Sequence, residues 1–237
     1  MKIGMVGGIG PESTLDYYQR LIKLYQKRTG GDDYPEIIIY SLNMTAMLKL
    51  VSDKKWDALS DMLAEAIYAL YRAGADFAFL ASNTPHIVFE RLQKIAPIPL
   101  VSIVEAAHIE AEKLNLKKLG LLGTSFTMQS SYYQTEFDKT GIVIVVPNAE
   151  EQRTIQEKLF SEIEQGIFLE ETRQGLLKIV QRLRKDEKID GVILGCTELP
   201  LILTKDEFGI PFLNTTKIHV QLIIEKYEEL SGGQIAN

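Results

Sequence analysis

The sequence lacks several features that mark whole classes of protein. Its 237 residues include one cysteine and three histidines. An internal disulfide therefore cannot form, and the histidines are too scattered along the chain for a metal cluster. No apolar run approaches the length of a membrane span, and the first residues lead into a strand-like segment rather than a signal peptide. We expect a cytoplasmic protein without a bound metal.

Positive charge is also in short supply. The chain has 26 basic and 32 acidic residues, which gives a formal net charge of −6. Proteins that bind nucleic acid usually carry a basic patch, whereas the short basic pairs here are typical of solvated surface. We therefore expect a small molecule as the partner, and neither nucleic acid nor a membrane.

Short apolar runs alternate with longer segments of helical period. This pattern is typical of an α/β fold in which a mainly parallel sheet is flanked by helices. Segments 56–73 and 150–164 are two of the amphipathic stretches whose apolar stripe a sheet can bury. The expected strands are 2–6, 37–40, 77–80, 100–103, 119–122, 143–146, 191–194 and 212–213.

Three short matches recur in the same order in the two halves of the chain. The segment at 3–7 resembles 119–123, the run around Ser82 resembles the run around Cys196, and 98–101 resembles 210–213. The offsets are 116, 114 and 112 residues. Internal repetition of this kind predicts two pseudo-symmetric lobes with a site in the cleft between them.

The chain is expected to cross between the lobes near each Ile-Pro run. Lobe 1 is predicted to comprise 1–97 plus 211–237, and lobe 2 to comprise 98–210.

Polar side chains follow the expected strands, at the sheet edge where α/β proteins bind ligands. Cys196 comes directly after Gly195 at a strand end, which favours a reactive thiol over an inert buried one. Ser82 occupies the matching place in the first half. Short donors and acceptors beside this pair suit an α-carboxylate and an α-amino group. Helix capping is the alternative and would be preferred for either residue run alone, but the repeat argues against two matched caps. They are Asn83, Thr84, Thr124 and Thr197.

The run from Gly7 to Ser13 (GGIGPES) follows a strand but is not a nucleotide motif. It lacks the third glycine of the dinucleotide fingerprint and the lysine of a P-loop. Gly8 and Gly10 would still let the backbone approach a small ligand closely, and a helix start can hold an anion. A purely structural turn is the alternative.

These motifs resemble the aspartate/glutamate racemase family, whose members are cofactor-independent amino-acid racemases. The resemblance covers nearly the whole chain and implies two α/β lobes, a homodimer and one catalytic cysteine from each lobe, of which Cys196 is one. It rests on the segments 7–13 (GGIGPES), 83–86 (NTPH), 123–124 (GT) and 194–200 (LGCTELP).

Racemisation needs two proton-transfer groups, because one must remove the Cα proton from one face and the other must return a proton to the opposite face. We expect Cys196 to be the general base for one enantiomer. A thiolate can serve in this way only if neighbouring donors or dipoles lower its pKa.

The chain departs from the family pattern at Ser82, which stands where the first cysteine is expected. A serine hydroxyl is a poor base unless a partner activates it. Four outcomes are open: a proton relay through water or His86, a slow and stereochemically biased enzyme, a member that no longer racemises, or a serine engineered to trap a substrate. We favour residual or biased racemisation. An amino-acid-binding protein without activity and a related isomerase or lyase of small carboxylates are the alternatives.

A second departure concerns the substrate. Aspartate-specific relatives hold the distal carboxylate with an arginine after the second strand and a lysine in a later helix, as the resemblance implies. The corresponding segments 43–47 (NMTAM) and 161–165 (SEIEQ) carry no cation, and Asn43 and Glu164 are the candidate substrate-binding residues there. If Glu164 faces the pocket, it repels an acidic side chain and favours a neutral or basic one. If it lies on a helix surface, it is uninformative.

Overall fold

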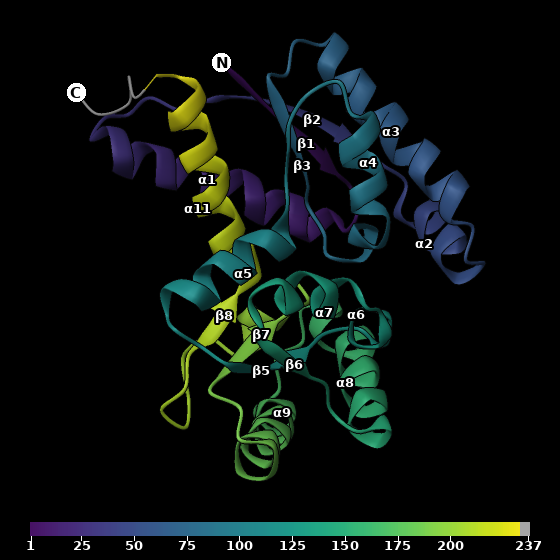
Figure 1. The fold of residues 1–237 in the computed structure, drawn as a ribbon, viewed down its shortest axis with the longest axis vertical. Helices are drawn as coiled ribbons and strands as arrows, with labels where there is room; N and C mark the ends of the chain where they lie inside the picture. Colours follow the sequence, from purple (N-terminus) through teal and green to yellow (C-terminus); the bar gives the residue numbers. More distant parts are fainter. Residues whose placement is uncertain (233–237) are drawn as a thin grey trace. The chain divides into compact units, whose positions relative to one another are not determined.

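The computed structural model describes residues 1–232, which form two compact units. Unit 1 comprises Met1–Ile103 and the described residues from His219 onward, and unit 2 comprises Val104–Ile218. Each unit holds one sheet of four parallel strands, in the order β2-β1-β3-β4 in unit 1 and β6-β5-β7-β8 in unit 2 (Figure 1). The identical strand order confirms the predicted α/β fold with two similar halves.

The strands are short and closely follow the expected apolar runs. Their bounds are β1 (Lys2–Gly7), β2 (Glu36–Ser41), β3 (Phe77–Leu80), β4 (Leu100–Val101), β5 (Lys118–Leu122), β6 (Val143–Val145), β7 (Gly191–Leu194) and β8 (Phe212–Asn214).

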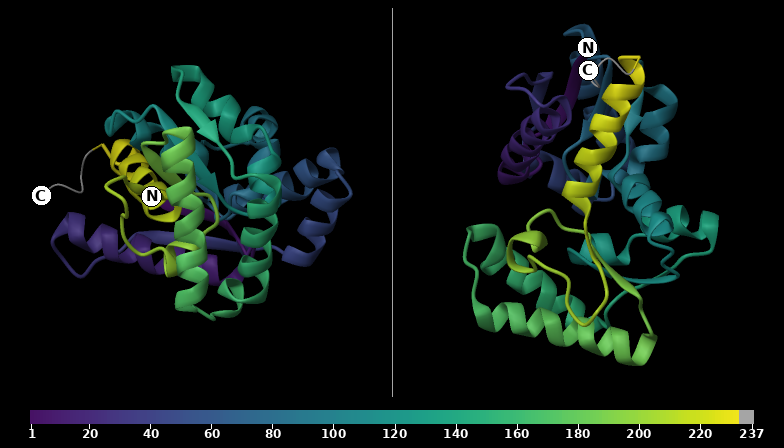
Figure 2. Two further views of the ribbon diagram at one scale, coloured as in Figure 1. Left: turned by 90° about the horizontal axis from the view of Figure 1, so that it is seen from below. Right: turned by 90° about the vertical axis from the view of Figure 1, so that its left-hand side faces the viewer.

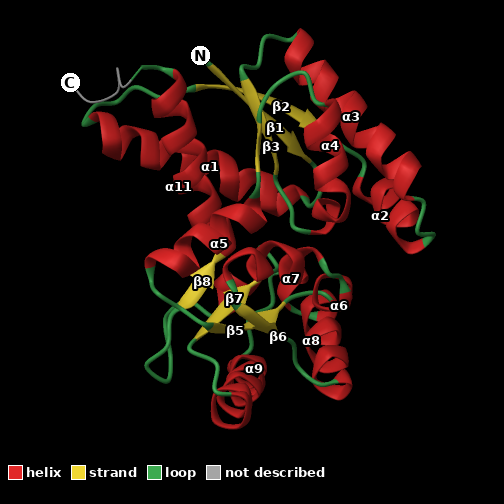
Figure 3. Cartoon of the chain, viewed as in Figure 1, coloured by secondary structure: helices red, strands yellow, loops and turns green. Residues whose placement is uncertain are grey.

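Helices connect successive strands in both units (Figure 3). None of those within residues 1–232 is long and apolar enough to cross a membrane. The α-helices are α1 (Pro11–Thr29), α2 (Met44–Ser52), α3 (Trp56–Arg72), α4 (Phe89–Ile95), α5 (Ile103–Lys113), α6 (Ser125–Gln129), α7 (Tyr132–Phe137), α8 (Ala149–Ser161), α9 (Glu170–Arg182), α10 (Leu199–Ile202) and α11 (Thr215–Leu230). Shorter helical turns are η1 (Thr84–Val88), η2 (Asp138–Thr140), η3 (Ile163–Gln165) and the π-helical η4 (Leu183–Glu187).

The unit boundaries differ from those expected at 97/98 and 210/211. Strand β4 pairs with β3 in the first sheet, and β8 pairs with β7 in the second. Each Ile-Pro run therefore leads into the last strand of its own sheet, and the chain changes unit only in or beside the following helix, α5 or α11. Residues 233–237, which the prediction assigned to lobe 1, lie outside the described residues.

In unit 1, alternate residues of the central strands pack against α1 and α11. These strand residues include Ile3, Met5, Phe77 and Phe79, and they share a buried cluster with residues of both helices. The two helices lie side by side against this face of the sheet (Figures 1 and 2). Each fully buried aliphatic side chain contributes roughly 1.5–3 kcal/mol to folding. The strand order and this helical cover hold the ends of β1 and β3 in place.

A buried histidine connects three elements of that core. The Tyr17 hydroxyl donates to Nδ1 of His219 over 2.8 Å, so Nε2 carries the ring proton and donates to the Val101 carbonyl over 3.1 Å. Burial is the main cause that lowers the pKa of His219 to about 3, and the nearby His86 adds to the effect. The neutral imidazole therefore links α11, α1 and β4.

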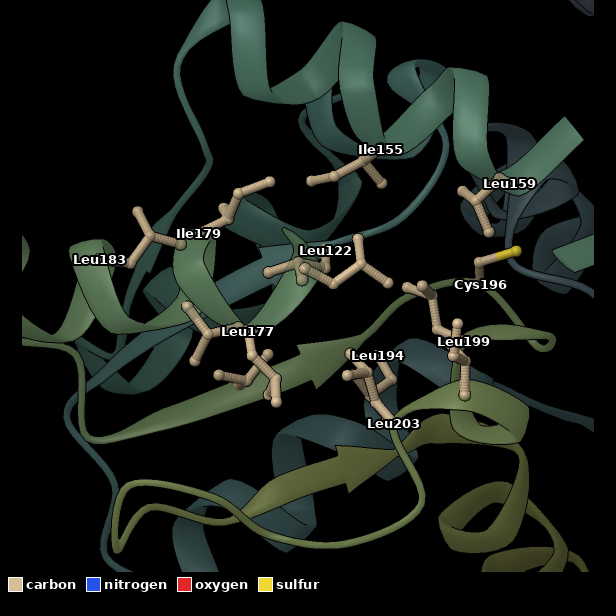
Figure 4. Packing of buried hydrophobic residues seen from close by; sticks show 14 of the residues in the cluster. Leu122, Ile155, Leu159, Leu177, Ile179, Leu183, Leu194, Cys196, Leu199 and Leu203 are labelled. Atoms are coloured by element: carbon tan, nitrogen blue, oxygen red, sulfur yellow. The ribbon is translucent and has the colours of Figure 1, made fainter. Parts of the chain in front are cut away.

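In unit 2, α8 and α9 cover one face of the second sheet. Leu122 of β5 and Leu194 of β7 belong to one buried cluster with Ile155, Leu159 and other apolar residues of these helices. Figure 4 shows Cys196 at one edge of this cluster, next to Leu159 and Leu199. The lone cysteine is thus held against a packed wall at the end of β7.

Replacing His219 by Gln tests the neutral imidazole. Its pKa of about 3 lies below the ordinary 6.5, so the unfolded chain binds one more proton between these values. The free energy of unfolding therefore falls as the pH drops through this window, by about 1.4 kcal/mol per pH unit for one such group. We expect His219→Gln to make this dependence shallower by about that amount in urea unfolding curves recorded between roughly pH 4 and 6.

Tyr17→Phe is the matched control. It removes the hydroxyl donor and costs about 1 kcal/mol, but it leaves a buried imidazole that still titrates. The control should keep the native pH slope. A native slope in His219→Gln would contradict the assignment.

Candidate functional site

The chain turns sharply after β1, and glycine is required there. Gly8 has a φ of +77°, and a Cβ at this position would lie 2.3 Å from the Leu42 carbonyl oxygen. The Thr14 hydroxyl accepts from the Gly8 N–H over 2.8 Å and donates to the Gly10 carbonyl over 3.0 Å. The backbone conformation and the lack of space thus explain the glycine at position 8. A ligand-binding role for Gly8 and Gly10 stays a prediction.

Ser82 lies just beyond β3, close to the start of α1. The Ser13 hydroxyl donates to the Ala81 carbonyl over 3.0 Å and fastens this strand end to the helix. Ser82 is half-buried, and within residues 1–232 its hydroxyl forms no hydrogen bond. Asn83 is buried at the head of η1, but its side chain does not cap that helix, and Thr84 is half-buried. Capping therefore does not explain Asn83.

His86 is a buried, neutral ring. Its Nε2 accepts from the Ile103 N–H over 3.3 Å, and the ring stacks on Phe89 at 4.6 Å. Burial lowers the pKa of His86 to about 3. The proton is therefore on Nδ1, which lies near the backbone of Ser82 and Asn83 without a well-aligned hydrogen bond. Because the acceptor nitrogen is occupied, His86 has no free base to offer the Ser82 hydroxyl.

At the matching position in unit 2, Cys196 follows a close approach of two strands. The Gly195 N–H donates to the Leu122 carbonyl over 2.7 Å, and a Cβ on Gly195 would lie 2.8 Å from the Leu121 side chain. Cys196 itself is 7% exposed. The backbone therefore places this thiol at one defined point beyond β7.

The thiol donates a hydrogen bond to a carboxylate. Cys196 Sγ lies 3.0 Å from Glu198 Oε2, and the Thr197 hydroxyl donates to the same oxygen over 2.8 Å. Glu164, from η3, completes an acidic group in which the ligand atoms of Glu164, Cys196 and Glu198 all lie within 4.8 Å of one another. Atoms this close together could also hold a metal ion, which the sequence analysis did not anticipate.

This environment disfavours negative charge. Burial raises the pKa of the Cys196 thiol well above its ordinary value, and the charge and hydrogen bond of Glu198 raise it further. A backbone N–H of Glu198 lowers it, but this effect is outweighed. Burial, and then the charge of Glu198, likewise raise the pKa of Glu164 to about 7. Donors were expected to lower the pKa of the thiol, but burial and Glu198 outweigh them. The resting thiol is therefore protonated.

Two other predicted residues cap helices. Thr124, at the end of β5, accepts from the Thr127 N–H over 3.2 Å and begins α6. Asn43 accepts from the Ala46 N–H over 3.1 Å, begins α2 and is exposed. Helix capping thus accounts for the side chains of both residues, and their role in substrate binding stays a prediction.

The structure brings Cys196, Thr197 and Glu164 together in unit 2, and it adds two residues that sequence reasoning missed. Glu198 lies in the motif 194–200, two residues after the cysteine, so the sequence could have identified it. No motif in the sequence pointed to Tyr132. Its hydroxyl donates to Thr127 over 3.3 Å, and burial, with a contribution from the charge of Cys196, raises its pKa above the ordinary value. The remaining predicted residues lie after β1, β2 and β3 in unit 1 or at the end of β5.

The chain is similar to known proteins over nearly its whole length. The family model described as Asp/Glu/Hydantoin racemase matches residues 6–223. The broad specificity amino-acid racemase RacX of Bacillus subtilis (strain 168) is 26% identical over 228 residues, which is 95% of this chain and 97% of that protein.

Solved structures match as well. An aspartate racemase homologue from Pyrococcus horikoshii OT3 is 36% identical, with a TM-score of 0.83 over 95% of this chain and 98% of its own. A putative Asp/Glu racemase from Yersinia pestis is 27% identical, with a TM-score of 0.87 over the same shares.

Replacing Glu198 by Gln tests the environment of the thiol. The change removes a negative charge and a strong acceptor, so the pKa of Cys196 should fall and its thiolate should become more abundant. We expect the variant to react with iodoacetamide about ten times faster near pH 7, which corresponds to a fall of one pKa unit. With a single cysteine in the chain, the alkylation rate reports this thiol alone.

Glu90→Gln provides the control, because Glu90 is exposed on α4 in unit 1. Its alkylation rate should equal that of the native protein. Equal or slower alkylation of Glu198→Gln would show that the carboxylate does not hold the thiol protonated.

Proposed function

Because this chain belongs to the Asp/Glu/Hydantoin racemase family, a family of isomerases, we propose that it racemises a free amino acid without pyridoxal phosphate or a metal. Cys196 is the proton-transfer group that we assign. The hydrogen bond of its thiol to Glu198, at a strand end inside the family match, is the observation that carries the proposal.

The Cys196–Glu198 contact provides a route to the thiolate. When the proton moves from Sγ to Glu198 Oε2, a thiolate and a neutral carboxyl replace a thiol and a carboxylate, so the buried site gains no net charge. The thiolate then takes the Cα proton and becomes a thiol again. In the reverse direction, the resting thiol delivers its proton to the Cα carbanion. A positioned acid or base of this kind is worth roughly 10²- to 10⁴-fold in rate.

We propose Ser82 as the group for the other face of Cα. Its hydroxyl is a weak acid with no hydrogen-bonded base among the described residues, and His86 has no free nitrogen to activate it. We therefore infer a slow enzyme that exchanges the proton of one enantiomer faster than that of the other.

The substrate's α-carboxylate needs donors. We propose the backbone N–H groups of Asn83, Thr84 and Thr197, with Gly8 and Gly10 allowing close approach of the backbone. The side chains of Asn43 and Thr124 are further candidates for contact. Neutralising the carboxylate also acidifies the Cα–H bond, because it stabilises the carbanion that forms.

The unactivated Ser82 also favours a second function, an amino-acid-binding protein that has lost turnover. Calorimetry combined with Cα exchange separates the two. Binding without exchange of any amino acid would support the binding protein, whereas exchange supports the racemase.

Solvent deuterium provides the direct test of the racemase. Each enantiomer of a panel of amino acids is incubated in D₂O, and deuterium at Cα is followed by NMR. We expect incorporation from both enantiomers at unequal rates, and its loss by roughly 10²-fold or more in Cys196→Ala. If none of the amino acids exchanges its Cα proton although the protein has a native circular dichroism spectrum, the proposal is wrong.

Ser82→Cys tests the second group. A thiol in this place would supply the missing proton-transfer group, so we expect the racemisation rate to rise by about 10²-fold or more, and the bias between enantiomers to shrink. Ser82→Ala is the matched control and should give no gain. A Ser82→Cys protein that folds and binds but racemises no faster would show that Ser82 does not serve the reacting carbon.

A further inference from the structure

Glu164 lies in the helical turn η3 and, unlike Glu162 at the start of the same turn, has no hydrogen-bond partner among the described residues. Glu162, two residues earlier, is bonded to Lys158 and Thr172. Glu164 is half-buried, and within residues 1–232 it forms neither an ion pair nor a hydrogen bond. A carboxyl group that gives up water without gaining a partner is costly. A cationic group bound beside Glu164 would offset this cost.

The surroundings of Glu164 strengthen the demand for a cation. Its carboxylate lies within 4.8 Å of the ligand atoms of Cys196 and Glu198, and Glu198 adds a second negative charge. Burial, and then the charge of Glu198, raise the pKa of Glu164 to about 7. A cation placed here gains from both carboxylates, whereas a third carboxylate meets repulsion from both.

The α-ammonium group cannot make Glu164 selective, because every amino acid carries one. Glu198 already accepts two hydrogen bonds, from the thiol and from Thr197, and it lies directly at the reacting sulfur. Glu164 comes from a different element, η3, and accepts none. A group that reaches Glu164 while Cα faces the thiol can come from the side chain of the substrate.

We propose that Glu164 determines substrate specificity by binding a cationic side chain, so that the enzyme prefers basic amino acids and rejects acidic ones. This inference rests on the proposed racemase function of the same site. The chemistry required is an ammonium or guanidinium group at the end of an aliphatic chain, which forms a charge-assisted hydrogen bond with the carboxylate.

The test compares four L-amino acids in the Cα exchange reaction: lysine, norleucine as its neutral analogue, glutamate and glutamine. We expect the native enzyme to favour lysine over norleucine in kcat/KM by about 10- to 100-fold, the value of one charge-assisted hydrogen bond. Glutamate should be the poorest of the four. Glu164→Gln should reduce the lysine preference to within about threefold, and Glu164→Lys should raise glutamate above lysine.

Glu157→Gln is the matched control. This residue is an exposed glutamate on α8, and its replacement removes the same charge outside the acidic group. It should keep the native preference. A native enzyme that prefers glutamate, or a Glu164→Gln variant that keeps the full lysine preference, would overturn the specificity role while leaving the racemase proposal intact.

If no amino acid exchanges at all, the racemase proposal fails and calorimetry still tests Glu164. Tighter binding of lysine than of norleucine by the native protein, lost in Glu164→Gln, would support the specificity role. Equal affinities, or no binding of either, would overturn it.

Discussion

The position of β7 between β5 and β8 is the constraint on which the unit 2 site depends. Parallel pairing on both sides buries the whole strand and places its last residue, Leu194, opposite both Leu122 and Asn214. The Gly195 hydrogen bond to β5 extends this pairing by one residue. The next side chain, the thiol of Cys196, therefore leaves the sheet at a defined point, where the carboxylate two residues later can accept its proton.

The two halves share a topology but not a chemistry. Ser82 precedes Cys196 by 114 positions, and at the same offset Thr84 stands where unit 2 has Glu198. The strand end of unit 1 thus has hydroxyl groups where unit 2 has a thiol and its carboxylate. The nearby imidazole of His86 is locked in a neutral state. The two units therefore share a strand order, while the thiol that donates to a carboxylate in unit 2 is replaced by a serine hydroxyl in unit 1.

Most of the fold could be predicted from local sequence, because buried parallel strands consist of continuous apolar runs. The bounds of β3 and β7, for example, are those expected. Each Ile-Pro run enters the last strand of its sheet, and the chain changes unit a few residues later, between 103 and 104 and between 218 and 219. The burial of the thiol could not be predicted from local sequence. Burial is the main cause that raises the pKa of Cys196, Glu198 raises it further, and Glu164, which approaches through the placement of η3, adds a smaller contribution.

The hydrogen bond of Cys196 to Glu198 has a consequence for the lifetime of the protein. Peroxide attacks thiolates far faster than thiols, and the chain has no second cysteine with which a sulfenic acid could form an internal disulfide. Oxidation of Cys196 beyond the sulfenic acid would be irreversible. A resting site that keeps its sulfur protonated therefore protects the single cysteine of the chain from oxidation.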